Sequence, residues 1–222
     1  TKGPLPFERA LPLAAQIADA LDRAHRSGII HGDLKPGNVM LTKGGIKLLD
    51  FGLARQRRPA PSADWADAST RSAQVAPDDA VMGTLQYLSP EQLDGRPSDE
   101  RTDIFACGAV IYEMLTARRA FDGDSRAAVV AAIVSSTPTA ASKVVKGVPA
   151  AVDRLIDACL AKDPDERWQH AGDLTRALQW VATESAEARL VNATSAVGAT
   201  WPWNVGAALL GLGVVVLGVL LW

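Results

Sequence analysis

The chain has 222 residues, a formal net charge of −2 and 48% hydrophobic residues, enough for one domain with a sizeable core. A charge this close to zero argues against a nucleic-acid-binding protein, which needs a basic face. Cys107 and Cys159 lie in apolar helical patterns without paired spacing, so we expect buried thiols in a reducing compartment rather than a zinc site. Since the chain begins with Thr1, we expect it to be part of a longer protein whose targeting signal is not visible.

Apolar spacing predicts most of the elements. Residues 11–25 have helical periodicity, and two short apolar runs at 39–41 and 46–49 flank the turn 42–45 as in a β-hairpin. The stretch 102–115 is apolar nearly all round, which favours a helix at the centre of a domain. Further helices are predicted over 128–135, over 152–160, and through Leu174, Leu178 and Val181. The predicted fold class is therefore α+β, mainly α.

Three segments lack this pattern. Residues 55–81 are rich in Arg, Pro, Ala, Ser and Asp, which predicts a mobile loop, and the composition after Thr183 predicts a linker over 183–203. Residues 205–222 carry no charged side chain. As a helix they span about 27 Å, close to the roughly 30 Å of a bilayer core. With Trp203 and Trp222 at its ends, residues 204–222 are predicted as a transmembrane helix, the alternative being a buried core helix or an adhesive tail.

The most informative pattern is the run His-Gly-Asp-Leu-Lys-Pro-Gly-Asn at residues 31–38, followed by Asp-Phe-Gly at 50–52. Magnesium-dependent phosphoryl transfer needs a group that orients the attacking hydroxyl, a cation on the phosphate and oxygen ligands for the metal. Asp33 can accept the hydroxyl proton, Lys35 can reach the phosphate, and Asn38 and Asp50 can ligate Mg²⁺. The hairpin between the last two residues predicts that both lie at the same end of a rigid element.

Residues 6–181 resemble the large C-terminal lobe of bacterial eukaryotic-like (Hanks-type) serine/threonine protein kinases. Besides the two motifs above, Gly-Thr-Leu-Gln-Tyr-Leu-Ser-Pro-Glu at 83–91 resembles the end of a kinase activation segment, with Ser89 in place of the usual Ala. Asp103 matches the helix Asp that bonds the backbone of the catalytic loop in that family. Arg167 matches the Arg that pairs with the Glu of the segment end, here Glu91.

The resemblance implies a kinase C-terminal lobe over residues 1–182, a helical bundle with a small β-hairpin at the catalytic cleft and an activation segment at 50–91. It implies ATP and Mg²⁺ as cofactors and Ser or Thr of proteins as substrate, because Lys35 follows the serine/threonine pattern. The implied catalytic residues are Asp33, Lys35 and Thr84, and Thr84 bonds to the other two. The nucleotide would contact Lys35, Asn38, Asp50 and Met40, the last under the adenine ring, with Asn38 and Asp50 on the metal.

Gly32 stands where many kinases carry an Arg that pairs with a phosphorylated activation segment. We therefore expect activity that does not depend on phosphorylation of that segment. We expect His31 to be a packing residue rather than a base, and the resemblance places it with Phe51 in a stacked apolar spine. His25 and His170 lie on predicted helices with no catalytic context, so we expect surface or packing residues.

Two other functions stay open at this stage. One is a pseudokinase that serves as an interaction module. The other is a small-molecule phosphotransferase of related fold, which shares the His-Gly-Asp-Leu opening but lacks the block at 83–91.

The kinase interpretation carries further expectations. No Gly-rich loop or Val-Ala-x-Lys strand precedes residue 31, so we expect this chain alone to be inactive. The complete protein is expected to be a single-pass membrane protein in signalling, with its kinase part in the cytoplasm and no nucleic-acid partner.

Overall fold

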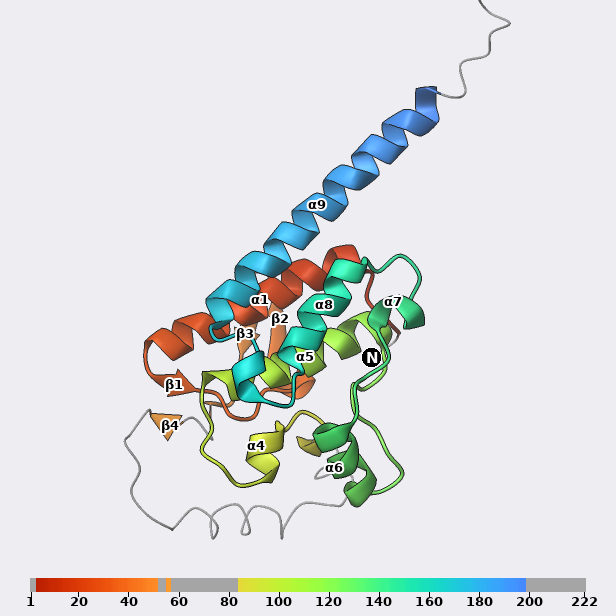
Figure 1. Ribbon diagram of the computed structural model, residues 1–222. Helices are drawn as coiled ribbons and strands as arrows, with labels where there is room; N and C mark the ends of the chain where they lie inside the picture. Colours follow the sequence, from red (N-terminus) through yellow and green to blue (C-terminus); the bar gives the residue numbers. More distant parts are fainter. Residues whose placement is uncertain (1–2, 52–54, 57–83, 199–222) are drawn as a thin grey trace, which may run out of the picture. The chain divides into compact units, whose positions relative to one another are not determined.

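The computed structural model describes residues 3–51, 55–56 and 84–198. The chain divides into two compact units, residues 1–183 and 184–222, and the site lies in the first. Within that unit the described residues are mainly helical, with a small β-hairpin (Figure 1). This agrees with the predicted α+β, mainly α fold.

Helix α1 spans Phe7–Arg26 and begins four residues before the predicted start. The apolar face already begins at Phe7, so the helical spacing extends one turn beyond the predicted start. The buried residues recur three and four apart and form one apolar face: Phe7, Ala10, Leu11, Ala14, Ala15, Ile17, Ala18, Leu21 and His25. This face packs on α5.

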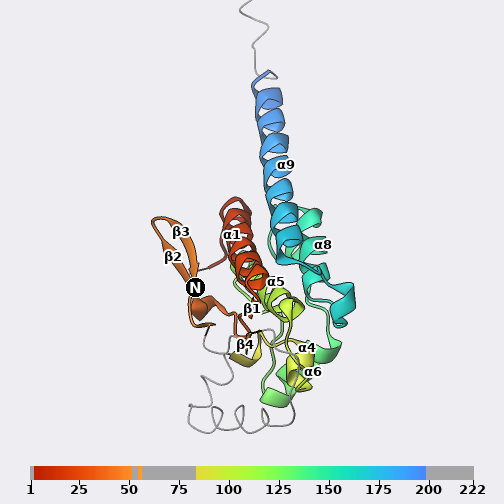
Figure 2. The ribbon, with the colours of Figure 1, turned by 90° about the vertical axis from the view of Figure 1, so that its left-hand side faces the viewer.

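Helix α5, Glu100–Thr116, is the central element, as its composition predicted. Asp99 caps its N-terminus by accepting a hydrogen bond from the Arg101 backbone N–H at 2.8 Å. Residues on all sides of the helix are buried, and Figure 2 shows α5 between α1 and α8 (Ala150–Cys159). Burial raises the pKa of the Cys107 thiol to about 12 and that of Cys159 well above its usual range. Both cysteines are thus inert apolar residues, as predicted.

The contact between α5 and α8 depends on one glycine. A Cβ atom on Gly108 would lie 2.5 Å from the Cys159 Cβ and 3.2 Å from the Leu160 side chain. Only a residue without a side chain lets the two helices approach this closely.

The predicted hairpin forms from β2, Val39–Thr42, and β3, Gly45–Leu48. Val39 pairs with Leu48 and Thr42 with Gly45, which leaves a two-residue turn. The hairpin is tied to α1 because the Gln16 side chain accepts a hydrogen bond from the Ile46 backbone N–H at 3.0 Å. A second antiparallel pair, β1 (Ile29–Ile30) with β4 (Arg55–Gln56), was not predicted, since two-residue strands have no periodicity to detect.

Further α-helices are α4 (Pro90–Leu93), α6 (Arg126–Ser135), α7 (Ala141–Val144) and α9 (Ala171–Gly198). The Lys162 ammonium donates to the Ile133 carbonyl near the end of α6 at 2.6 Å and lies 4.1 Å from the centre of the Phe121 ring. Burial, and secondly the charge of Arg167, lower the pKa of Lys162 to about 8.

Helix α9 continues through residues 183–198, which the sequence predicts as a linker. The Ala and Glu residues of this stretch are good helix formers, so a linker-like composition is also compatible with a helix. The predicted loop beyond Gln56 and the predicted transmembrane helix at 204–222 lie outside the described residues. Among the residues that are described, no helix has both the length and the apolar character needed to cross a bilayer.

Replacing Gly108 with Ala tests the close approach of α5 and α8. Because the new methyl group overlaps Cys159, we expect Gly108→Ala to lower the free energy of unfolding by about 1–3 kcal/mol, partly offset by the better helix propensity of alanine. Chemical denaturation measures this. Gly37→Ala, where a Cβ meets nothing within 4 Å, is the matched control. Unchanged stability of Gly108→Ala would contradict the packing described here.

Candidate active site

The loop of residues 31–38 connects β1 to the hairpin. It ends in a 3-10 turn, Pro36–Asn38, in which Pro36 takes a first-turn position where no backbone N–H is needed. Strand β2 follows directly, so the hairpin fixes the end of the loop. The loop is therefore held at one end by the pair of β1 with β4 and at the other by the pair of β2 with β3.

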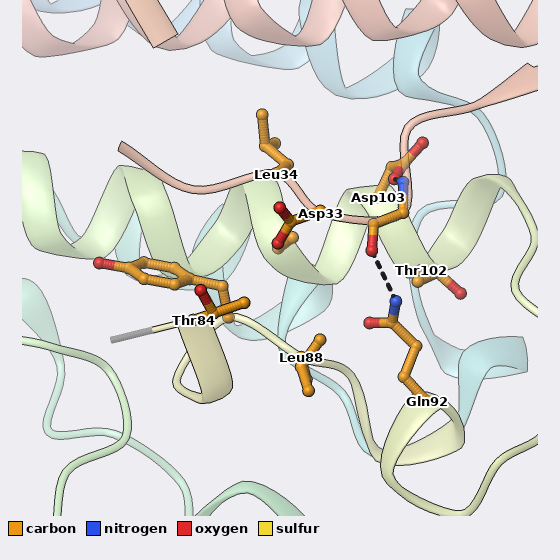
Figure 3. Close-up of a pocket in the computed structure, with 10 residues that line it drawn as sticks. Asp33, Leu34, Thr84, Leu88, Gln92, Thr102 and Asp103 are labelled. Atoms are coloured by element: carbon orange, nitrogen blue, oxygen red, sulfur yellow. Dashed lines mark hydrogen bonds between the residues drawn. The ribbon is translucent and has the colours of Figure 1, made fainter. Parts of the chain in front are cut away.

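Lys35 joins two of the other predicted site residues. Its ammonium donates to the Asp33 carboxylate at 2.7 Å and to the Thr84 hydroxyl at 3.1 Å, although Thr84 is 49 positions away in sequence. Figure 3 shows the Asp33 carboxylate pointing toward the segment that carries Thr84. The three predicted catalytic residues thus lie together, with a cation beside a carboxylate.

Asn38, in the same loop, also contacts the Asp33 carboxylate. It is 5% exposed, and its amide nitrogen donates to the Asp33 backbone carbonyl at 2.8 Å and to the Asp33 carboxylate at 3.3 Å. Because both bonds use the nitrogen, the amide oxygen faces elsewhere and is left to bind a cation.

The hairpin holds Asp50 at the same end as Asn38. The Leu49 backbone N–H donates to the Asn38 carbonyl at 2.8 Å, which extends the ladder to the residue before Asp50. Asp50 is exposed and has a φ of +54°, a left-handed conformation that Asp tolerates better than most residues. The backbone therefore holds Asn38 and Asp50 at the same end of the hairpin, as the sequence predicts.

This pair of oxygens fits Mg²⁺. An amide oxygen and a carboxylate are hard ligands, and Mg²⁺ bound to a nucleotide takes only one or two such ligands from the protein. Across the described part of the chain, no group of three or more His, Cys, Asp and Glu side chains forms a metal cage. The residues present suit a metal that arrives with phosphate oxygens.

Met40 lies on β2, outside this polar group, and is 42% exposed. Its neighbour Leu41 and the nearby Leu49 are exposed as well. The contact of Met40 with an adenine ring stays a prediction.

His31 is a packing residue, as predicted. It is fully buried, its ring lies 4.6 Å from that of Phe51, and its Nδ1 accepts a hydrogen bond from the Asp33 backbone N–H at 3.3 Å. The proton therefore sits on Nε2, which donates to the Leu49 carbonyl at 3.0 Å. Both ring nitrogens are in use, so His31 serves to join the 31–38 loop to the end of the hairpin.

A buried carboxylate on α5 holds the backbone of this loop. Asp103 is 1% exposed and accepts hydrogen bonds from the backbone N–H groups of His31 and Gly32, each at 2.8 Å. The third donor is the His25 ring on α1, also at 2.8 Å. The family-based expectation for Asp103 thus agrees with the geometry.

His25 has a role beyond the one predicted from the sequence. It was expected to be a surface or packing residue, yet it is 6% exposed and bonds a residue 78 positions away. One signal could have found it: His25 follows Leu21 by four positions and so lies on the apolar face of α1. His170 is indeed on the surface, with its side chain 70% exposed and Glu100 at 3.5 Å.

The segment of residues 84–91 is anchored to α5 and to Arg167. The Tyr87 hydroxyl donates to the Glu113 carboxylate, and the Thr102 hydroxyl donates to Glu91 at 3.0 Å. Arg167 donates two hydrogen bonds to the same Glu91 carboxylate, at 2.7 and 2.8 Å. This bidentate pair was expected from the resemblance.

Hydrogen bonds to neighbouring groups also satisfy the buried pair of Arg167 with Glu91. Arg167 also donates to the carbonyls of Ala161, Arg101 and Lys162. Burial by itself raises the pKa of Glu91, but the hydrogen bond and charge of Arg167 outweigh it and hold the pKa below its usual range. The ionised form is therefore favoured in the fold, and its stabilisation is lost as the pH falls through the lowered pKa.

Removal of the Arg167 guanidinium should destabilise the fold. We expect Arg167→Met to reduce the free energy of unfolding by about 3–5 kcal/mol at neutral pH, because a carboxylate is left buried and unpaired. The double variant Glu91→Leu with Arg167→Met should recover part of that loss. The deficit of Arg167→Met should also narrow as the pH falls toward the ordinary glutamate pKa of 4.5, where the carboxyl takes up a proton. Equal stability of the single variant and the wild type in urea denaturation would contradict the role of the pair.

Comparison with known proteins agrees with this geometry. A model of the protein kinase domain matches residues 1–180. The chain is 38% identical to a probable serine/threonine-protein kinase of Streptomyces coelicolor over 201 residues, 90% of this chain and 28% of the relative. It is 39% identical to serine/threonine-protein kinase PknB of Mycolicibacterium smegmatis over 175 residues, 78% of this chain and 26% of the relative.

The chain thus spans about a quarter of the length of these curated relatives. The matched residues include the whole of the 31–38 loop, the hairpin and the 84–91 segment. We conclude that the chain belongs to the protein kinase domain family.

Proposed function

We propose that this chain is the C-terminal lobe of a serine/threonine protein kinase that transfers the γ-phosphate of ATP to Ser or Thr hydroxyls of protein substrates. The observation that carries the proposal is the bridge from the Lys35 ammonium to both Asp33 and Thr84. It joins the loop that bears the proton acceptor to the segment that would receive the substrate. The family and the names of the relatives support the same activity.

The geometry suggests a division of labour. The Asp33 carboxylate would accept a hydrogen bond from the substrate hydroxyl and orient it for in-line attack on the phosphate. The Lys35 ammonium, held beside Asp33, would neutralise charge that develops on the transferred phosphate oxygens. The Thr84 hydroxyl keeps Lys35 at that position. Asn38 and Asp50 would hold Mg²⁺, which supplies further charge neutralisation at the phosphates.

We further propose that the kinase is anchored in a membrane by residues 204–222 and acts in signalling, with its catalytic part in the cytoplasm. Support for the anchor comes from the sequence: residues 205–222 are uncharged and flanked by Trp residues. ATP is cytoplasmic, which favours that side for the kinase part.

Replacement of the proton acceptor tests the activity. In the full-length protein we expect Asp33→Asn to lower kcat by about 10²–10⁴-fold, since the amide cannot accept the hydroxyl proton. Binding of ATP should stay nearly unchanged, because Asp33 does not hold the nucleotide. Phosphate transfer to a protein substrate measures the first quantity and nucleotide titration the second. Asp94→Asn, at an exposed carboxylate, is the control; full turnover by Asp33→Asn would contradict the assignment.

Gly32 leads to a second expectation. It offers no cationic side chain to a phosphorylated activation segment, so phosphorylation there should not be required. We expect the triple variant Ser69→Ala, Thr70→Ala and Ser72→Ala, at positions outside the described residues, to keep the wild-type kcat. Steady-state assays of the full-length protein check this. Abolished turnover would show that the segment is switched by phosphorylation after all.

A further inference from the structure

The peptide units around Gly32 are held from two sides. The Gly32 N–H donates to the Asp103 carboxylate at 2.8 Å, and the Gly32 carbonyl accepts a hydrogen bond from the Gln92 side chain at 2.9 Å, drawn as the dashed line in Figure 3. Gly32 has a φ of +75° and directly precedes Asp33. Glycine leaves the backbone free to rotate, so bonds from outside must fix its conformation.

Gln92 is itself fixed by its other end. Its amide oxygen accepts a hydrogen bond from the Ser89 backbone N–H at 3.0 Å and one from the Ser89 hydroxyl at 3.3 Å. The orientation of the amide follows from its partners: only the nitrogen can donate to a carbonyl, and only the oxygen can accept from an N–H. Gln92 therefore cannot rotate away from Gly32 without losing the cap of α4.

The segment that carries Gln92 is also held in place by hydrogen bonds. The preceding residue is Glu91, whose carboxylate is bound by Arg167 and by Thr102. Asp103, which holds the other side of Gly32, is the neighbour of Thr102 on α5. Both contacts to the glycine thus come from one interconnected support.

We propose that Gln92 is a positioning residue for phosphoryl transfer, which holds the Gly32 carbonyl and so fixes the direction of the Asp33 side chain. This inference rests on the proposed kinase function. The alternative is that Gln92 only caps α4, in which case its bond to Gly32 has no effect on turnover.

Two substitutions at position 92 separate these roles. Gln92→Glu keeps an oxygen for the Ser89 N–H, as in an ordinary capping box, but places an acceptor against the Gly32 carbonyl. Gln92→Met removes the bonds to the Gly32 carbonyl and to both Ser89 groups, with little change in volume. In the full-length protein we expect both to lower kcat by about 10- to 100-fold, because a small displacement of a catalytic group is enough for such a loss. Both should lower the Tm, because each loses the bond to the Gly32 carbonyl, and Gln92→Met should lower it further because it also loses the bond from the Ser89 N–H.

The pH dependence of Gln92→Glu gives a readout that a purely structural role would not move. The facing carbonyl favours the protonated form of the introduced carboxyl, and that form regains an O–H donor for Gly32. The ratio of variant to wild-type kcat should therefore rise as the pH falls. For Gln92→Met the ratio should stay constant, and Ser89→Ala, which leaves both bonds of Gln92 to backbone groups intact, should keep the wild-type kcat.

The expected result is a reduced kcat in both variants at a temperature well below either Tm, with an unchanged KM for ATP and a ratio of Gln92→Glu to wild-type kcat that rises as the pH falls. Wild-type kcat in both Gln92→Glu and Gln92→Met, despite a lowered Tm, would overturn the inference and leave Gln92 a helix cap. Absence of phosphate transfer by the wild-type protein would overturn the proposed function itself, and the positioning role with it.

Discussion

The buried carboxylate of Asp103 is the interaction on which the site depends. An ionised carboxylate inside a protein costs several kcal/mol unless hydrogen bonds satisfy it. Here three donors do so, and two of them are backbone N–H groups of the 31–38 loop. Because the carboxylate needs these donors, the loop backbone is bound to α5, and the polar side chains that follow point to a common place.

Helix α5 supports both halves of the site. On one side Asp103 holds the 31–38 loop, and on the other Thr102 and Glu113 bind the 84–91 segment. The two halves meet where Lys35 reaches Thr84. The apolar residues of α5 pack on α1 and α8, so the burial of this helix fixes the relative placement of residues that lie far apart in the sequence.

Local patterns predicted the elements and the main site residues. The longer helices and the hairpin follow from apolar spacing, and Asp33, Lys35 and Asn38 follow from one eight-residue run. The four-residue helices α4 and α7 were not predicted, because they are too short to show a period. Contacts between residues far apart in the sequence were harder to predict. The resemblance supplied Asp103 and the pair of Glu91 with Arg167, but His25 bonds across 78 positions and Gln92 across 60, and no local spacing encodes such partners. The pairing of β1 with β4 was missed because two-residue strands have no periodicity to detect.

The most direct test is a crystal structure of the full-length protein with Mg²⁺ and a non-hydrolysable ATP analogue. We expect the amide oxygen of Asn38 and the carboxylate of Asp50 to bind the metal at about 2.0–2.1 Å, with Lys35 near the terminal phosphate and Asp33 facing the position of the substrate hydroxyl. A metal bound without either oxygen, or an Asp33 side chain turned away from the phosphate, would contradict the assignment of this chain as a phosphoryl-transfer lobe.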